Sequence, residues 1–223
     1  MSKGIFITFI DSDDLYPDIF TLELMLVNAI KNKVLICGGG LRHFYQKKNK
    51  IIILKNNNIE FTKYGLTKYY DYQYNYFFQR FIYKKNFIKK YKLYFPNYLR
   101  FQDPPFFIKT MAIAKNFYAL KNITYLHRIW QKPLIFNERK ITDVYKGIKN
   151  CLDISKSMNL YKSYYLTLAI LNKNFIIINA KKYLKSKRLK HSISLVLKAI
   201  NYNLIKKNNF TFFLNEFYNI FNK

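Results

Sequence analysis

The chain has 223 residues, 50% of them hydrophobic, and a net charge of +27 from 39 basic and 12 acidic side chains. This hydrophobic content excludes a disordered tail, and the length allows one domain or two small ones. A positive surplus of this size predicts a polyanionic partner, either nucleic acid or an anionic membrane.

The first part of the chain, residues 1–66, is predicted to be a small α/β portion with a hairpin. Unbroken β-branched and aromatic runs indicate strands, apolar residues at helical spacing indicate a helix, and three consecutive asparagines indicate a hairpin turn. Gly38, Gly39 and Gly40 are expected to form a tight turn after a strand. The expected elements are a strand over 5–10, a turn over 11–18, a helix over 20–31, a strand over 33–37 and a hairpin joining 50–54 to 59–64.

Residues 67–140 form an aromatic and basic connecting region in this interpretation. Alternating tyrosines from Tyr70 indicate a strand, and the apolar residues of 77–91 keep helical phase. Pro104 and Pro105 predict an extended link, because proline restricts the residue before it to extended backbone. A helix or buried strand is expected over 108–119, followed by irregular chain over 127–139.

The last part, residues 141–223, is predicted to be mostly helical and basic. Thr142 is expected to cap a helix whose buried face consists of Val144, Tyr145, Ile148, Cys151 and Leu152. Further helical segments are expected over 160–171, 175–179, 180–207 and 210–221, the third of them a single long basic helix. The fold class is therefore α+β, with a mostly α-helical C-terminal half after the small α/β portion.

The cysteines and apolar runs exclude several classes of protein. Cys37 and Cys151 are too far apart in the sequence to indicate a disulfide framework or a zinc site, so we expect two small buried side chains. No apolar run reaches the 18 residues that a membrane span needs, and the run over 4–10 is too short for a signal peptide. We therefore expect no transmembrane span and no secretory signal.

An acidic run directly after the first strand is the one pattern that suggests catalysis. Asp11, Ser12, Asp13 and Asp14 resemble the opening motif of the haloacid-dehalogenase phosphatases, which implies Asp11 as nucleophile and Asp13 as acid/base beside Mg²⁺. Leu15 departs from the Thr or Val of that motif, and the family's later Lys and acidic pair have no counterpart. The preferred interpretation is a turn whose aspartates cap the following helix.

The three histidines, His43, His127 and His191, lie far apart in the sequence and not at metal-ligand spacing. We interpret them as structural. The sequence thus predicts no catalytic residue, no cofactor and no metal site.

Lysine-rich clusters are the strongest functional pattern, because several basic runs occur almost without compensating acids. Lysine places point charges on phosphates and reads bases poorly, which favours folded RNA recognised by its shape. The predicted RNA-binding residues are Lys47, Lys48, Lys50, Lys84, Lys85, Lys89, Lys90, Lys92, Lys181, Lys182, Lys185, Lys187, Arg188, Lys190, His191, Lys206 and Lys207.

In composition and charge the chain resembles ribosomal proteins encoded by AT-rich mitochondrial genomes, such as those of ciliates, because residues with A- and T-rich codons dominate and 33 of the 39 bases are lysine. The resemblance implies a structural constituent of the ribosome in the mitochondrial matrix. Its partners would be rRNA and other ribosomal proteins, with no small-molecule substrate. The alternative is an accessory subunit of an organellar respiratory complex at an anionic membrane surface.

Overall fold

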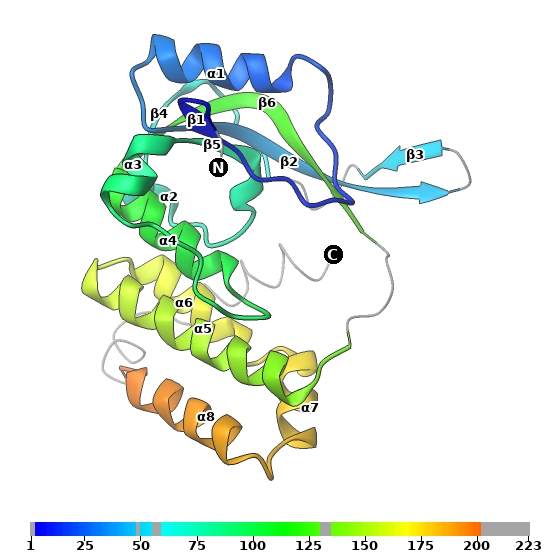
Figure 1. Cartoon of the computed structure of the whole chain (residues 1–223), viewed down its shortest axis with the longest axis vertical. Helices are drawn as coiled ribbons and strands as arrows, with labels where there is room; N and C mark the ends of the chain where they lie inside the picture. Colours follow the sequence, from blue (N-terminus) through cyan, green and yellow to red (C-terminus); the bar gives the residue numbers. More distant parts are fainter. Residues whose placement is uncertain (1–2, 48–49, 55–58, 130–134, 202–223) are drawn as a thin grey trace. The chain divides into compact units, whose positions relative to one another are not determined.

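The computed structural model describes residues 3–47, 50–54, 59–129 and 135–201 (Figure 1). They form two compact units, which we describe separately. The sheet unit comprises Met1–Tyr72, Phe77–Tyr94 and Thr110–Pro133, and the helical unit comprises Gln73–Tyr76, Phe95–Lys109 and Leu134–Lys223. The fold class is α+β, as predicted, with a strand-rich first part and a mostly helical C-terminal half. The division of the sequence at residues 66 and 140 stays a prediction.

Some predicted features lie outside the described residues. They are the asparagine turn at 56–58, the segment 210–221, Lys48, Lys206 and Lys207.

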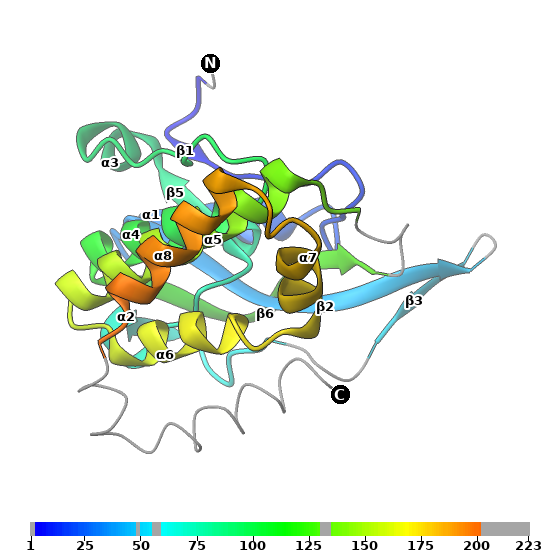
Figure 2. The ribbon, with the colours of Figure 1, turned by 90° about the horizontal axis from the view of Figure 1, so that it is seen from below.

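One six-stranded sheet forms the sheet unit, with strand order β1-β5-β2-β6-β4 and β3 paired to β2. The central pair β2 and β6 is parallel, with Cys37 opposite Tyr118 and Phe44 opposite Arg128, while the other pairs are antiparallel. Beyond this pair, β2 and β3 continue as a two-stranded ribbon (Figure 2). The strands are β1 Phe6–Ile7, β2 Ile36–Lys47, β3 Lys50–Ile53, β4 Gly65–Lys68, β5 Phe81–Lys84 and β6 Asn116–Arg128.

The three glycines continue strand β2, so the predicted tight turn is wrong. They are needed because neighbouring backbone approaches very closely: a Cβ at Gly39 would lie 2.1 Å from the carbonyl oxygen of Asn122, and one at Gly38 would lie 2.3 Å from that of Arg80. A hairpin is present, as predicted, but its strands differ from those predicted: β3 pairs with the preceding strand β2, and Ile59 forms an isolated bridge to Leu41.

Helix α1 (Thr21–Lys31) covers one face of this sheet (Figure 1). Its bounds agree with the helix predicted over 20–31 to within one residue. Its inward residues Met25 and Ala29 pack against Cys37, Ile82 and Leu120 of three strands. Cys37 is thus a small buried side chain, as predicted, and its burial raises the thiol pKa to about 12.

Between residues 69 and 91, the observed elements differ from those that the apolar pattern predicted. Of the alternating tyrosines, Tyr70 and Tyr72 lie in the short helix α2 (Tyr69–Tyr72), and Tyr74 and Tyr76 lie in irregular chain after it, so the predicted strand is wrong. Phe77 has a positive φ of 61° and begins a break, after which the predicted helix over 77–91 becomes the 3-10 turn η1 (Phe78–Arg80), strand β5 and helix α3 (Lys85–Lys90).

Pro104 and Pro105 lie in the first turn of α4 (Asp103–Ala114), so the predicted extended link is wrong. A first-turn N–H has no intrahelical acceptor, and proline therefore costs little there. The apolar segment over 108–119 was predicted to be a helix or a strand. It contains one of each, because α4 ends at Ala114 and β6 begins at Asn116.

In the helical unit, four consecutive helices pack together around one core, and the predicted buried face of α5 belongs to that core. The helices are α5 Glu138–Ser157, α6 Tyr161–Ile170, α7 Asn174–Lys182 and α8 Lys187–Ala199. Val144, Ile148 and Leu152 of α5 pack with Leu189 and Val196 of α8, which lies along α5 (Figure 2). None of the described helices is long and apolar enough to cross a membrane.

Two caps displace the predicted helix boundaries. Asn137 caps α5 by accepting a hydrogen bond from the Lys140 backbone N–H at 2.9 Å, so the helix begins before Thr142. The single helix predicted over 180–207 is wrong, because α7 ends at Lys182 and the Ser186 hydroxyl caps α8 by accepting from the Leu189 backbone N–H at 3.1 Å.

Candidate functional site

Asp11, Ser12, Asp13 and Asp14 form a turn after strand β1, here called the acidic turn. The backbone N–H of Asp14 closes it by donating to the Asp11 carbonyl oxygen at 3.1 Å. Leu15 then pairs with Leu126 of β6 through two backbone hydrogen bonds of 3.1 and 2.9 Å. The acidic turn is therefore attached to β6, a strand more than 100 residues later in the chain.

Asp14 is the anchor of the acidic turn. Its carboxylate is buried and accepts two hydrogen bonds of 2.7 Å, one from the Tyr125 hydroxyl and one from the Arg128 backbone N–H. Burial raises the pKa of Asp14, and these two hydrogen bonds oppose that rise. The predicted helix-capping role is wrong, because α1 has no side-chain cap at its N-terminus and Asp14 holds β6 instead.

Asp11 and Asp13 are exposed, with backbones held by the same strand. The Asp11 N–H donates to the Tyr125 hydroxyl oxygen at 3.2 Å, and the Asp13 carbonyl accepts from Arg128 Nε at 2.7 Å. One carboxylate oxygen of Asp11 accepts from Gln79 Nε2 at 2.9 Å. Within the described residues, the Asp13 carboxylate has no hydrogen-bond or ion-pair partner.

The acidic turn can therefore offer carboxylate oxygens of Asp11 and Asp13 to a hard divalent cation. No three His, Cys, Asp or Glu side chains in the described part of the chain are grouped as a metal site, so a cation would need further oxygens from its ligand. Mg²⁺ is commonly bound in this way, by one or two carboxylates together with substrate phosphates. The residues present fit that mode.

Two of the three histidines meet next to the acidic turn. His43 of β2 and His127 of β6 are opposite each other in the parallel register, and their Nδ1 atoms lie 3.0 Å apart. Burial and the neighbouring His127 lower the pKa of His43 to about 4, so this ring is neutral near pH 7. His43 and His127 are 84 residues apart in the sequence, so their contact could be predicted only from the β2–β6 pairing.

The predicted RNA-binding residues occur in three groups. In the sheet unit, Lys47 and Lys50 are opposite each other where β2 meets β3, and a second group lies in and around α3. The third group belongs to α7, α8 and the loop between them. All of those described are exposed except the half-buried Lys85. Their contact with a polyanion stays a prediction.

No protein-family model matches the sequence, and no curated protein matches it. Solved structures of S. aureus TarS, residues 1–349, share its fold. The complex with UDP-GlcNAc has a TM-score of 0.59 and 13% identity, covering 91% of this chain and 60% of that chain. The complex with UDP has a TM-score of 0.56 and 14% identity, covering 91% and 58%. The chain thus spans less than two thirds of the length of these TarS chains.

The likeness to TarS contradicts the prediction of a mitochondrial ribosomal protein that binds rRNA and lacks enzymatic activity. Composition and charge, on which that prediction rested, say which polymers attract a chain but do not determine its fold. TarS is a glycosyltransferase, and two of its structures hold a nucleotide ligand. The same finding contradicts the alternative of a respiratory subunit and the predicted lack of a small-molecule substrate. The mitochondrial location stays a prediction.

Sequence reasoning noticed the acidic run but assigned it a capping role, and it missed Gln79, Tyr125 and Arg128 altogether. The acidic run itself was the pattern that could have indicated the candidate site, because several aspartates directly after a strand lie together where that strand ends. Nothing in the sequence connects Tyr125 or Gln79 to it, since these contacts span 111 and 68 residues.

Proposed function

We propose that the sheet unit binds the diphosphate of a nucleotide sugar through a divalent cation held by Asp11 and Asp13, as part of an enzyme that transfers the sugar. The observation that carries the proposal is the acidic turn: two exposed carboxylates held against β6 in a fold shared with TarS, whose solved structures bind UDP-GlcNAc and UDP.

The chemistry requires that a leaving diphosphate be stabilised. In sugar transfer, an acceptor hydroxyl oxygen bonds to the anomeric carbon, the bond from that carbon to the diphosphate breaks, and the hydroxyl proton is lost to a base. A bound divalent cation would supply positive charge to the diphosphate oxygens as that bond breaks.

The residues around the acidic turn would orient the cation ligands. Gln79 fixes one oxygen of Asp11, which leaves the other for the cation. Tyr125 and Arg128 hold the backbone of Asp11 and Asp13, so both residues are positioned before a ligand arrives. Holding ligands in place in advance reduces the entropy that binding costs. The net charge of +27 would also attract an anionic substrate.

Calorimetric titration of UDP into the chain, with Mg²⁺ or with EDTA, tests the proposal. We expect binding that needs the cation, and a loss of about tenfold or more for Asp11→Asn and for Asp13→Asn, because each removes a charged ligand. The matched control is Asp71→Asn, which neutralises an exposed aspartate of α2 in the same unit and should bind like the wild type. Equal affinity in the Asp11→Asn/Asp13→Asn double variant would refute the proposal.

A further inference from the structure

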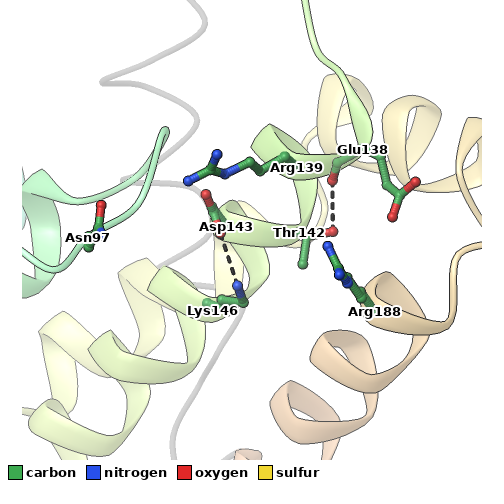
Figure 3. Close-up of a pocket in the computed structure, with 7 residues that line it drawn as sticks. All are labelled: Asn97, Glu138, Arg139, Thr142, Asp143, Lys146 and Arg188. Carbon is green, nitrogen blue, oxygen red and sulfur yellow. Dashed lines mark hydrogen bonds and ion pairs between the residues drawn. The ribbon is translucent and has the colours of Figure 1, made fainter.

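A pocket of about 330 Å³ lies in the helical unit, over the first turns of α5 (Figure 3). It is lined by Asn97 from the segment before α4, by Arg188 from α8 and by residues of α5 between Glu138 and Lys146. Its volume is within the usual range for small-molecule sites, about 300–1,000 Å³. Nothing in the proposed nucleotide-sugar site uses it.

The acids of this pocket are already engaged. Asp143 is buried, and its two oxygens accept from Lys146 Nζ at 3.1 Å and from the Leu99 backbone N–H at 3.0 Å. Glu138 accepts from the Ser186 hydroxyl at 2.6 Å, which ties the start of α5 to the start of α8. These contacts leave the two carboxylates little capacity to hold a cation.

Two guanidinium groups of the pocket remain available. Arg139 and Arg188 are exposed and have neither a hydrogen bond nor an ion pair within the described residues. In the close-up, the Arg139 guanidinium extends along the side of the pocket where Asn97 and Asp143 lie, while the Arg188 guanidinium points toward Thr142 (Figure 3). The two positive groups therefore serve different parts of one pocket.

The helices add further positive potential at the same place. Both α5, with 20 residues, and α8, with 13 residues, begin beside the pocket, at Glu138 and Lys187. One N–H at each start already donates to its cap, Asn137 or Ser186. The other first-turn N–H groups have no acceptor within the helix, and the helix dipole favours an anion at this end. An anion in the pocket would meet two guanidinium groups and two helix starts.

We propose that this pocket binds a ligand carrying two phosphate groups, one contacted by Arg139 and the other by Arg188. The planar guanidinium forms paired hydrogen bonds with phosphate oxygens, which gives phosphate an advantage over a single carboxylate. The site requires no divalent cation, because arginine supplies the positive charge. It therefore uses other residues and other chemistry than the proposed nucleotide-sugar site.

Titration of pyrophosphate into the whole chain in EDTA tests the proposal, since chelation removes any contribution of a metal site. The wild type should bind, and the Arg139→Gln/Arg188→Gln double variant should bind at least tenfold more weakly. Arg100→Gln is the matched control, since it removes one exposed arginine of the helical unit that does not line the pocket. Thermal unfolding should be nearly unchanged in both variants, because the three arginine side chains are exposed.

Two results would overturn the proposal. The first is equal pyrophosphate affinity in the double variant and in Arg100→Gln, which would show general attraction to a basic chain. The second is a lack of binding by the wild type up to millimolar pyrophosphate. Asp11→Asn should leave pyrophosphate binding in EDTA intact, and the double arginine variant should leave Mg²⁺-dependent UDP binding intact, so each proposal can fail without the other.

Discussion

Tyr125 donates a hydrogen bond of 2.7 Å to the buried carboxylate of Asp14, joining the end of β6 to a turn 111 residues earlier in the chain. The same hydroxyl oxygen accepts from the Asp11 backbone N–H. One tyrosine therefore fixes both the anchor of the acidic turn and the backbone of the residue that we propose as a cation ligand.

Removing this hydroxyl should destabilise the protein and loosen the site. In Tyr125→Phe, one oxygen of the buried Asp14 loses its donor, and an unsatisfied buried acceptor costs about 1–3 kcal/mol. Urea unfolding should show this loss, and Mg²⁺-dependent UDP binding should weaken as well. Tyr94→Phe is the control, since Tyr94 is exposed and should give wild-type values. Unchanged stability in Tyr125→Phe would contradict the anchoring role.

His43 should make stability depend on pH in a defined window. Its pKa is lowered to about 4 in the folded state from 6.5, so the unfolded chain binds this proton more readily. The free energy of unfolding should therefore fall as pH falls from about 6.5 to about 4. The full shift corresponds to about 3 kcal/mol, and we expect about half of it because His43 is only half-buried.

Urea unfolding of His43→Gln at several pH values measures this contribution. The variant should lose the part of the pH slope that arises from His43, so its stability relative to the wild type should improve toward pH 4. His191→Gln, on the exposed surface of α8, should keep the wild-type slope. Parallel curves for His43→Gln and the wild type would disprove the buried neutral state of His43.

Gly39 should tolerate no side chain. A Cβ there would lie 2.1 Å from the Asn122 carbonyl oxygen and 2.8 Å from the Thr124 methyl group, so β2 and β6 would have to separate. We expect Gly39→Ala to cost about 2–3 kcal/mol of unfolding free energy. Gly65→Ala is the matched control, because nothing lies within 4 Å of its Cβ position. Similar stabilities of the two variants would argue against the β2–β6 pairing.

Ser186 distinguishes two short helices from one long helix by the sign of its effect. As the cap of α8, its replacement by alanine should destabilise the protein by about 1 kcal/mol. Inside a continuous helix, alanine would instead stabilise, because it has the highest helix propensity. Ser194→Ala, at an exposed position within α8, should be neutral or stabilising. Thermal unfolding of both variants gives the answer.

Local periodicity predicted those parts of the fold in which one element alone decides its structure. The apolar spacing of α1 and of the buried face of α5 appears in the sequence because each helix has one face against a core. Caps were harder to assign, because Thr142, Asn137 and Ser186 all favour helix starts and only backbone geometry selects among them.

The rest depends on contacts between distant segments. Gly38 and Gly39 look like turn residues until β6 and Arg80 are known to approach β2. Asp14 looks like a cap until Tyr125 and Arg128 are placed beside it. The charge surplus drew the functional prediction toward RNA, because net charge reports attraction to anions of any kind and cannot distinguish a nucleotide sugar from a nucleic acid.

The most direct test of the central claim is to locate the cation. Mn²⁺ broadens the NMR signals of nearby nuclei, so amide spectra of the chain with substoichiometric Mn²⁺ and UDP would map its position. The account predicts selective broadening at the acidic turn, above all at Ser12 and Asp13, with little effect at Asp71 and a loss of the effect in Asp13→Asn. Broadening that spares the acidic turn while UDP and Mn²⁺ are bound would contradict it.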